Sequence, residues 1–378
     1  MEKYVETSGN SFPKLLDNTV ESVCKGPVDV ALMGRIGMEL TVTNNTLIEF
    51  ARQEDQLAYD KEYNRLFDCM NHIIETCSNT RISIHGITID QWKLRELHIH
   101  IDGNQGDDGI DVCMHSDDWV IEFTATPMTL TQLIEYRDCL ECIVYESTAR
   151  LGLCPHTRIG GGHIHFETQT HFGSDGATLR NFLVDMNNRP ELFLGGLSFD
   201  LLNAPPICIL HKAQQDAFRD VVSEFDHLEH PSIEWLCANV NTRVYNKSFV
   251  RDNTNVWELT YFRKWPQKFQ LINLLHKHTI ELRGLRPQKS VKELIALASL
   301  FQTRVIQIAA DARRIPIAFR DMSGDVSVTV ERNMETYHTT TPMQQHVKLA
   351  VVALIHDCYP DRLHRDNAVN NICHLNVV

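Results

Sequence analysis

Short segments in which a chemically functional side chain alternates with an apolar one are the feature that most constrains this chain. Residues 163–167 read His-Ile-His-Phe-Glu and residues 279–283 read Thr-Ile-Glu-Leu-Arg; residues 39–41 and 121–124 alternate in the same way. Successive side chains of a β-strand point to opposite faces of its sheet, so these segments predict strands with one apolar and one polar face. One sheet face is therefore expected to gather carboxylates, imidazoles and a guanidinium.

The remaining periodicity predicts further strands and several helices. Strand character is expected at residues 28–42, 93–102, 111–126, 163–168, 256–262 and 279–285, with a turn at 103–109. Helices are expected at 46–76, 130–151, most of 177–246, 291–310 and 344–355. Strands that cluster early and return after helices predict an α+β fold, with a curved antiparallel sheet and helices packed on its outer face.

No internal repeat or Gly/Pro/Ser-rich linker divides the chain. We therefore expect a polar leader at residues 1–27 and a single catalytic domain at residues 28–378. The 43% hydrophobic and 22% charged residues are typical of a globular protein.

The charge balance limits the partners. Asp and Glu total 49 against 36 Lys and Arg, a formal net charge of −13. Such a chain repels nucleic acid and anionic lipid, so neither nucleic acid nor a membrane is expected as a partner. No signal peptide is evident, and a cytoplasmic location is expected. The cysteines are expected to be free thiols, and the Cys139-Leu-Glu-Cys142 pair is not expected to bind structural zinc.

The polar face suggests a nucleotide-bound metal. Mg²⁺ or Mn²⁺ prefers oxygen ligands with an occasional imidazole, and such an ion bridges the phosphates of a nucleotide. Arg283 would neutralise charge on a transferring phosphoryl group. The glycines that precede His163 would let the backbone approach a ligand closely.

These motifs carry a resemblance to a known family. In chain order they are Gly37-Met-Glu39, Trp119-Val-Ile-Glu122 followed by Thr124-Ala-Thr-Pro127, Gly161-Gly-His163-Ile-His165, and Thr279-Ile-Glu281-Leu-Arg283. The ordered set resembles the glutamine synthetase and glutamate–cysteine ligase superfamily, closest to its amidoligase-type branch. Glutamine synthetases have a whole domain before the first motif, so the resemblance does not extend to a true glutamine synthetase or to its large rings.

The resemblance implies metal ligands. Glu39, His163 and Glu281 would hold the ion that bridges the β- and γ-phosphates of ATP. Glu122 would hold a second ion, nearer the carboxylate of the substrate. Glu281 would thereby belong to the catalytic machinery together with Arg283.

The resemblance also implies nucleotide contacts. His165 would face the phosphates, and Arg283 would contact the γ-phosphate during transfer. Arg263 and Lys264 are candidates for further phosphate contacts, as an alternative to a solvated basic surface. Arg286 is expected either to serve the site or to cap the following loop.

One position departs from the family pattern. The family often has Glu-x-Glu in the first motif, whereas this chain has Glu39-Leu-Thr41. A ligand of the second ion is then missing or comes from elsewhere. His115, Asp117 or Asp118, shortly before Glu122, would be the replacement, and Asp117 is the residue we include in the predicted metal site.

The implied activity is an ATP-dependent carboxylate–amine ligase. ATP would phosphorylate an amino-acid-like carboxylate, and an amine would attack the acyl phosphate to form an amide. Family members commonly assemble, so a homo-oligomer is possible. The alternatives are a guanidino-kinase-like phosphotransferase, a non-catalytic binding homologue and a zinc hydrolase.

Two further His-x-His pairs underlie the zinc hydrolase alternative. His98 and His100 lie in an alternating segment that is either a solvated sheet face or part of the mouth of the site. His276 and His278 are assigned no role.

Overall fold

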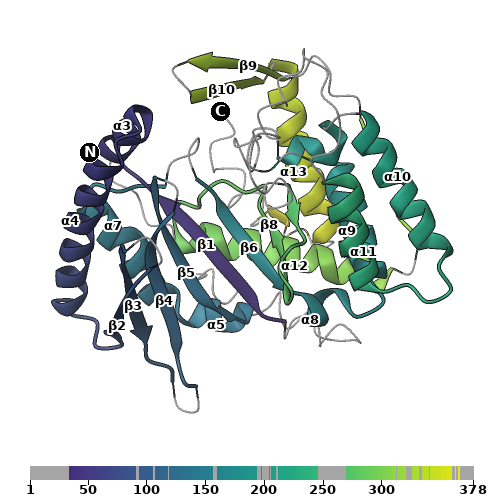
Figure 1. Ribbon diagram of the computed structural model, residues 1–378. Helices are drawn as coiled ribbons and strands as arrows, with labels where there is room; N and C mark the ends of the chain where they lie inside the picture. Colours follow the sequence, from purple (N-terminus) through teal and green to yellow (C-terminus); the bar gives the residue numbers. More distant parts are fainter. Residues whose placement is uncertain are drawn as a thin grey trace.

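The computed structural model describes residues 34–90, 93–104, 107–117, 119–155, 160–193, 197, 204, 206–209, 212–245, 270–311, 313–320, 326–331, 334–339, 341–359, 362 and 365–366. The expected leader 1–27 and the expected strand 256–262 lie outside these residues. The described residues form an α+β fold built on a large antiparallel sheet (Figure 1).

The large sheet has eight strands, and every neighbouring pair is antiparallel. In spatial order the strands are β2 (Ile82–Ile89), β3 (Arg95–Ile101), β4 (Ile110–Asp117), β5 (Val120–Met128), β1 (Ile36–Val42), β6 (Gly162–Glu167), β8 (Thr279–Leu282) and β7 (Ile272–Asn273). A separate two-stranded sheet pairs β9 (Val326–Glu331) with β10 (Met334–Thr339).

The pairing register places the functional side chains on one face, as the alternation predicted. Residues that oppose one another on neighbouring strands share a face of the sheet. One such row crosses five strands from β3 to β6 and consists of His98, Cys113, Thr124, Glu39 and His163. This polar face, which we define by that row, continues into β8 and β7 because His165 opposes Glu281 and Glu281 opposes Asn273.

The opposite face of the sheet is apolar and packs against helices. Met38, Leu40, Ile164 and Leu282 point to it and are buried. Helix α4 (Gln56–Glu75) contacts β2 and β3, and α5 (Leu130–Glu135) contacts β5. The hydroxyl of Tyr59 on α4 donates to the carbonyl of Val120, 2.8 Å away, and ties the helix to the sheet. Figure 1 shows α4 alongside the sheet.

The first expected helix, residues 46–76, is in fact two helices. Helix α3 (Asn45–Gln53) ends at Glu54, whose φ of 55° is left-handed, and Asp55 caps the start of α4 by accepting from the amide of Ala58. Leu57 fits the apolar spacing that predicted a helix at 46–76, but the structure leaves this residue 81% exposed instead of packing it in the core.

Other boundaries also differ from expectation. The expected strand 111–126 is a hairpin of β4 and β5, reversed next to Trp119, whose φ is 75°. Strand β2 was not expected. The expected helix 130–151 consists of α5, α6 (Arg137–Leu140), a π-helical segment η1 (Glu141–Glu146) and α7 (Ser147–Arg150).

Helices dominate the second half of the chain, as expected. They are α8 (Thr168–Phe172), α9 (Ala177–Asn187), η2 (Pro190–Leu192), η3 (Ile207–Ile209), α10 (Lys212–His227), α11 (Ile233–Asn239), η4 (Val240–Val244), α12 (Val291–Ala310) and α13 (Thr341–Cys358). Among the described helices, α12 is long and apolar enough to cross a membrane, but 78% of its most apolar window is buried in the protein. It packs against α5, α8, α9 and α13 as a core helix.

The described cysteines are free thiols, as expected. Each cysteine of the Cys139–Cys142 pair contacts a residue outside the pair. The sulfur of Cys142 lies 3.7 Å from that of Cys77, and the sulfur of Cys139 accepts from the side-chain amide of Asn79.

Candidate functional site

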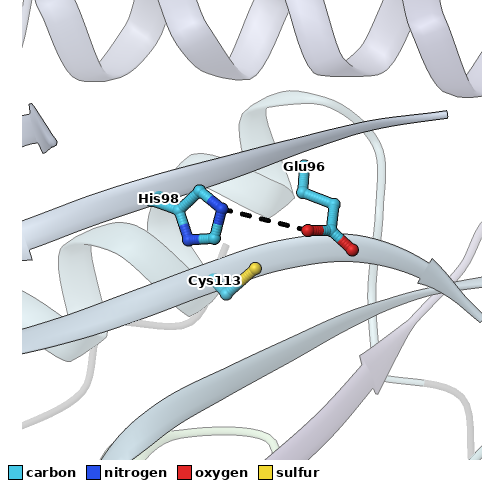
Figure 2. A group of neighbouring side chains, drawn as sticks. All are labelled: Glu96, His98 and Cys113. Atoms are coloured by element: carbon cyan, nitrogen blue, oxygen red, sulfur yellow. Dashed lines mark ion pairs between the residues drawn. The ribbon is translucent and has the colours of Figure 1, made fainter. Parts of the chain in front are cut away.

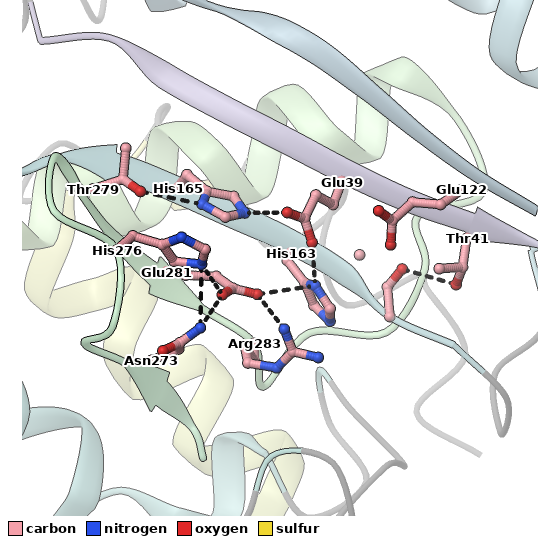
Figure 3. A network of polar contacts seen from close by, with 12 residues as sticks. Glu39, Thr41, Glu122, His163, His165, Asn273, His276, Thr279, Glu281 and Arg283 are labelled. Carbon is pink, nitrogen blue, oxygen red and sulfur yellow. Dashed lines mark hydrogen bonds and ion pairs between the residues drawn. The ribbon is translucent and has the colours of Figure 1, made fainter. Parts of the chain in front are cut away.

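The centre of the polar face is a cluster of Glu39, His163, His165 and Glu281 from β1, β6 and β8 (Figure 3). Nδ1 of His163 lies 2.9 Å from Oε2 of Glu39 and 3.1 Å from Oε1 of Glu281. Nε2 of His165 lies 2.9 Å from the other oxygen of Glu39. The structure therefore brings together the three residues predicted to hold the phosphate-bridging ion.

Glu281 is the most enclosed member of the cluster, with 1% of its side chain exposed. Asn273 donates its side-chain amide to Oε2 at 2.6 Å, and Nε2 of His276 lies 3.1 Å from the same oxygen. Arg283 donates Nη1 to Oε1 at 2.5 Å. These contacts fix the carboxylate so that it faces His163.

The charges in this cluster stabilise one another. Burial alone would raise the pKa of Glu39, but hydrogen bonding with His163 and His165 outweighs it and holds that pKa far below its usual range. Burial likewise opposes ionisation of Glu281, yet His163, His276 and Arg283 hold its pKa well below normal. Burial and the charge of Arg283 lower the pKa of His163, but its hydrogen bonds to Glu281 and Glu39 outweigh both and raise it to about 9.

A second group of acids adjoins the first on the polar face. Glu122 opposes Thr41 on β1 and His115 on β4, and Nε2 of His115 lies 3.0 Å from its Oε1. Burial raises the pKa of Glu122, and the charges of Glu39 and Asp117 add to this rise against the hydrogen bond from His115. Burial would lower the pKa of His115, but Cys113 and Glu122 together raise it to about 10. Negatively charged neighbours thus contribute to both shifts, beside the burial that acts on Glu122.

The donor atoms fit a divalent metal ion. One ligand atom from each of Glu39, His163 and Glu281 lies within 4.8 Å of the others. Nε2 of His165 is buried and faces the same group, 2.9 Å from Oε1 of Glu39. Carboxylates with one imidazole are a ligand set that Mg²⁺ and Mn²⁺ accept. Figure 3 shows that the Glu122 carboxylate points toward the space beside Glu39.

Thr41, the residue at which the chain departs from the family pattern, makes a structural contact. Its hydroxyl donates to the carbonyl of Gly161 at 3.0 Å and ties β1 to the segment before β6. Gly160 has a φ of +86°, and a Cβ atom there would lie 1.9 Å from Oγ1 of Thr41. The glycines thus bring this segment against β1, whereas their expected approach to a ligand stays a prediction.

The remaining predicted residues fall into three groups. Asp117 lies on the polar face, close enough to raise the pKa of Glu122, which keeps its predicted role open. Arg286 is 3% exposed and lies 3.3 Å from Glu293 at the start of α12, a contact that favours an anchoring role over the predicted nucleotide contact. Arg263, Lys264 and Asp118 lie outside the described residues.

Sequence reasoning missed two partners of the predicted ligands. His276 was assigned no role and yet contacts Glu281, as does Asn273. His115, one of the three residues considered as a replacement ligand, contacts Glu122. The alternating pattern found ligands inside strands, but His276 follows the two-residue strand β7, which is too short to show a pattern. Only the pairing of β7 with β8 places it.

Comparison of the chain with protein-family models, with curated proteins and with solved structures returned no match. The arrangement of the polar face is therefore the basis on which its function is inferred.

Proposed function

We propose that this chain is an ATP-dependent carboxylate–amine ligase with a glutamine-synthetase-like catalytic sheet. The observation that carries the proposal is the convergence of Glu39, His163 and Glu281, taken from three strands, into one group of metal-ligand type in which His163 and Glu281 are buried and Glu39 is half-buried. These are the positions at which the family resemblance places the ligands of the phosphate-bridging ion. The second acidic group around Glu122 adjoins them, as a site with two ions would need.

A divalent ion held by Glu39, His163 and Glu281 would offset the negative charge of the ATP phosphates. The chain itself positions the reactants. Arg283 is held at 2.5 Å by Glu281 on the polar face, where its charge would neutralise the phosphoryl group in transfer. His165, 12% exposed, lies on the same face for a phosphate contact.

The reaction proposed has two steps. A carboxylate oxygen of the amino-acid-like substrate attacks the γ-phosphorus of ATP, which forms an acyl phosphate and releases ADP. The lone pair of an amine then attacks the acyl carbon, the C–O bond to phosphate breaks, and the nitrogen loses a proton to leave an amide. Positioning and neutralisation of charge are the contributions expected from the protein.

The assay combines the full chain, ATP and Mg²⁺ with panels of amino acids and amines, and follows ADP, free phosphate and product masses. A ligase yields ADP, phosphate and an amide. A stable phosphorylated product would instead establish the guanidino-kinase-like alternative. Hydrolysis of an added compound in the absence of ATP would favour the zinc hydrolase alternative. No turnover in any pairing of acid and amine would favour the alternative of a non-catalytic binding protein.

Variants test the site assignment. Glu281→Gln and His163→Ala should each lower turnover about 100-fold or more, since each removes charge or a ligand at the phosphates. His276→Ala, which leaves the ligands present but frees one oxygen of Glu281, should cost about 10-fold. Glu224→Gln is the matched control, because Glu224 is an exposed carboxylate that pairs with Arg243. Full activity in Glu281→Gln would overturn the assignment.

A further inference from the structure

A second group of metal-ligand type lies on the same polar face, toward the β2 edge of the sheet. It consists of Glu96 and His98 on β3 and Cys113 on β4 (Figure 2). His98 and Cys113 are directly opposed in the β3–β4 register, and Glu96 is two residues before His98 on the same face. Strand β5 separates this group from Glu39 on β1.

The three side chains already converge. One ligand atom from each lies within 4.8 Å of the others, and Nε2 of His98 is 3.9 Å from Oε2 of Glu96. All three residues are half-buried, so an ion can reach them from solvent without a large desolvation cost. In Figure 2 the sulfur of Cys113 points toward the space between the imidazole and the carboxylate.

Thr88 on the neighbouring strand β2 contacts both Glu96 and His98. Thr88 opposes Glu96 on β2, and its hydroxyl donates to Oε2 of Glu96 at 2.9 Å. The same hydroxyl lies 2.8 Å from Nε2 of His98. Because this hydroxyl gives its proton to Glu96, it accepts from Nε2 of His98 and leaves Nδ1 as the ring nitrogen for an ion. Partners of this kind hold ligands in orientation and affect metal affinity without touching the metal.

The ligand types differ from those of the Glu39 cluster. A thiolate beside an imidazole and a carboxylate suits a borderline cation such as Zn²⁺, which binds Cys, His and Glu in tetrahedral geometry. Mg²⁺ and Mn²⁺ prefer sites without sulfur. Zinc–ligand bonds of about 2.0–2.3 Å require the three ligand atoms, which lie within 4.8 Å of one another, to close around the ion.

We propose that Glu96, His98 and Cys113 form a binding site for Zn²⁺ or a similar borderline divalent cation, with the fourth position open to water or an external ligand. The bound ion cross-links β3 and β4 near the sheet edge. This site shares no ligand with the Glu39 cluster, although Cys113 also neighbours His115, which contacts Glu122.

Cobalt(II) is the probe, because a Co²⁺–thiolate bond gives an intense charge-transfer absorption band in the near ultraviolet. The full chain, treated with a chelator and kept reduced with a phosphine, is titrated with Co²⁺ and then with Zn²⁺. We expect one equivalent of Co²⁺ to produce the band and Zn²⁺ to abolish it by displacement. Cys113→Ser should remove the band, and Thr88→Val should weaken Co²⁺ binding about 10-fold.

Two controls separate this site from others. Cys154→Ser removes an exposed thiol elsewhere and should leave the band unchanged. Glu281→Gln should also leave the Co²⁺ band unchanged, because Glu281 is not a ligand of this site. The Co²⁺ titration and the ligase assay can therefore fail or succeed separately. Circular dichroism checks that each variant is folded, and Glu96→Gln serves if Cys113→Ser does not fold. Absence of the band in the unaltered chain, or its persistence in folded Cys113→Ser, would overturn the proposal.

Discussion

His171 on α8 is a buried histidine, and its contacts require a proton on one ring nitrogen and none on the other. Nδ1 lies 3.0 Å from the carbonyl oxygen of Glu167, so it donates, and Nε2 lies 3.1 Å from the side-chain nitrogen of Gln302, so it accepts. The ring also packs edge-on against Phe166. This arrangement suits the neutral ring, and burial lowers the pKa of His171 to about 4, although the backbone and charge of Glu167 oppose the shift.

The low pKa of His171 makes stability depend on pH. The unfolded chain takes up the proton near pH 6.5, whereas the folded chain resists it until about pH 4. Stability from this residue is therefore complete above pH 6.5 and is lost as the pH falls toward 4, by about 3 kcal/mol.

His171→Asn keeps a donor for the Glu167 carbonyl but cannot titrate. We expect the variant to be less stable at pH 7.5, and the difference in unfolding free energy between variant and unaltered chain to shrink as the pH approaches 4. Urea unfolding at several pH values measures this difference. A difference that stays constant with pH would show that His171 does not titrate as described.

For individual residues, the sequence predicted the proposed metal ligands better than it predicted the residues that contact and orient them. Glu39, His163 and Glu281 lie inside alternating strands, so period-2 geometry alone assigns them to one face. Asn273 and His276 reach Glu281 through a strand pairing that no local pattern encodes.

Among the elements, the glycine at the start of β6 shows how backbone packing positions the predicted metal ligand His163. A Cβ atom on Gly162 would lie 2.5 Å from the carbonyl oxygen of Arg286 and 2.3 Å from Nε2 of Gln288. Gln288 in turn donates to the carbonyl of Gly162 at 3.0 Å. The segment after β8 is therefore in direct contact with the residue that precedes His163.

Gly162→Ala should cost about 2 kcal/mol of stability, because the clash involves backbone and displaces the start of β6. Gly86→Ala is the matched control, since Gly86 is also in a strand and a Cβ atom there meets nothing within 4 Å. Thermal unfolding measures the change in stability, and turnover measures whether displacing the start of β6 disturbs the proposed site. If the two alanine variants were equally stable, the close packing around Gly162 would be unimportant.

Element boundaries were predicted less well than element types. Strand β2 escaped notice because a register shift between Ile84 and Gly86 interrupts its alternation. Helices α3 and α4 merged in the prediction because their apolar spacing is continuous, and only the left-handed Glu54 and the cap at Asp55 separate them.

For the molecule as a whole, the hydrophobic core extends from β1 to the residues after α13 without a break among the described residues. Phe301 of α12 is fully buried and stacks on Phe193, with ring centroids 6.4 Å apart. The α+β class follows from the order of strands and helices along the sequence, but the eight-strand order required the long-range pairing of β1 with β5 and β6.

A continuous core predicts one cooperative unfolding transition. Phe301→Ala should lower the free energy of unfolding by about 3–5 kcal/mol, because a large buried ring is replaced by a cavity. The fluorescence and circular dichroism curves in urea should shift together. Two separate transitions, with only one of them shifted, would contradict the single domain predicted at residues 28–378.

The central place of β1 in the sheet has a consequence for how the proposed site assembles. Glu39 is synthesised early but meets His163, 124 positions later, only after β6 has formed, and Glu281 arrives later still. Contacts between such distant segments close slowly, since a long loop must first be ordered. The proposed catalytic centre is thus among the last parts of the sheet to assemble, and a nascent chain that ends before β8 would be unable to consume ATP.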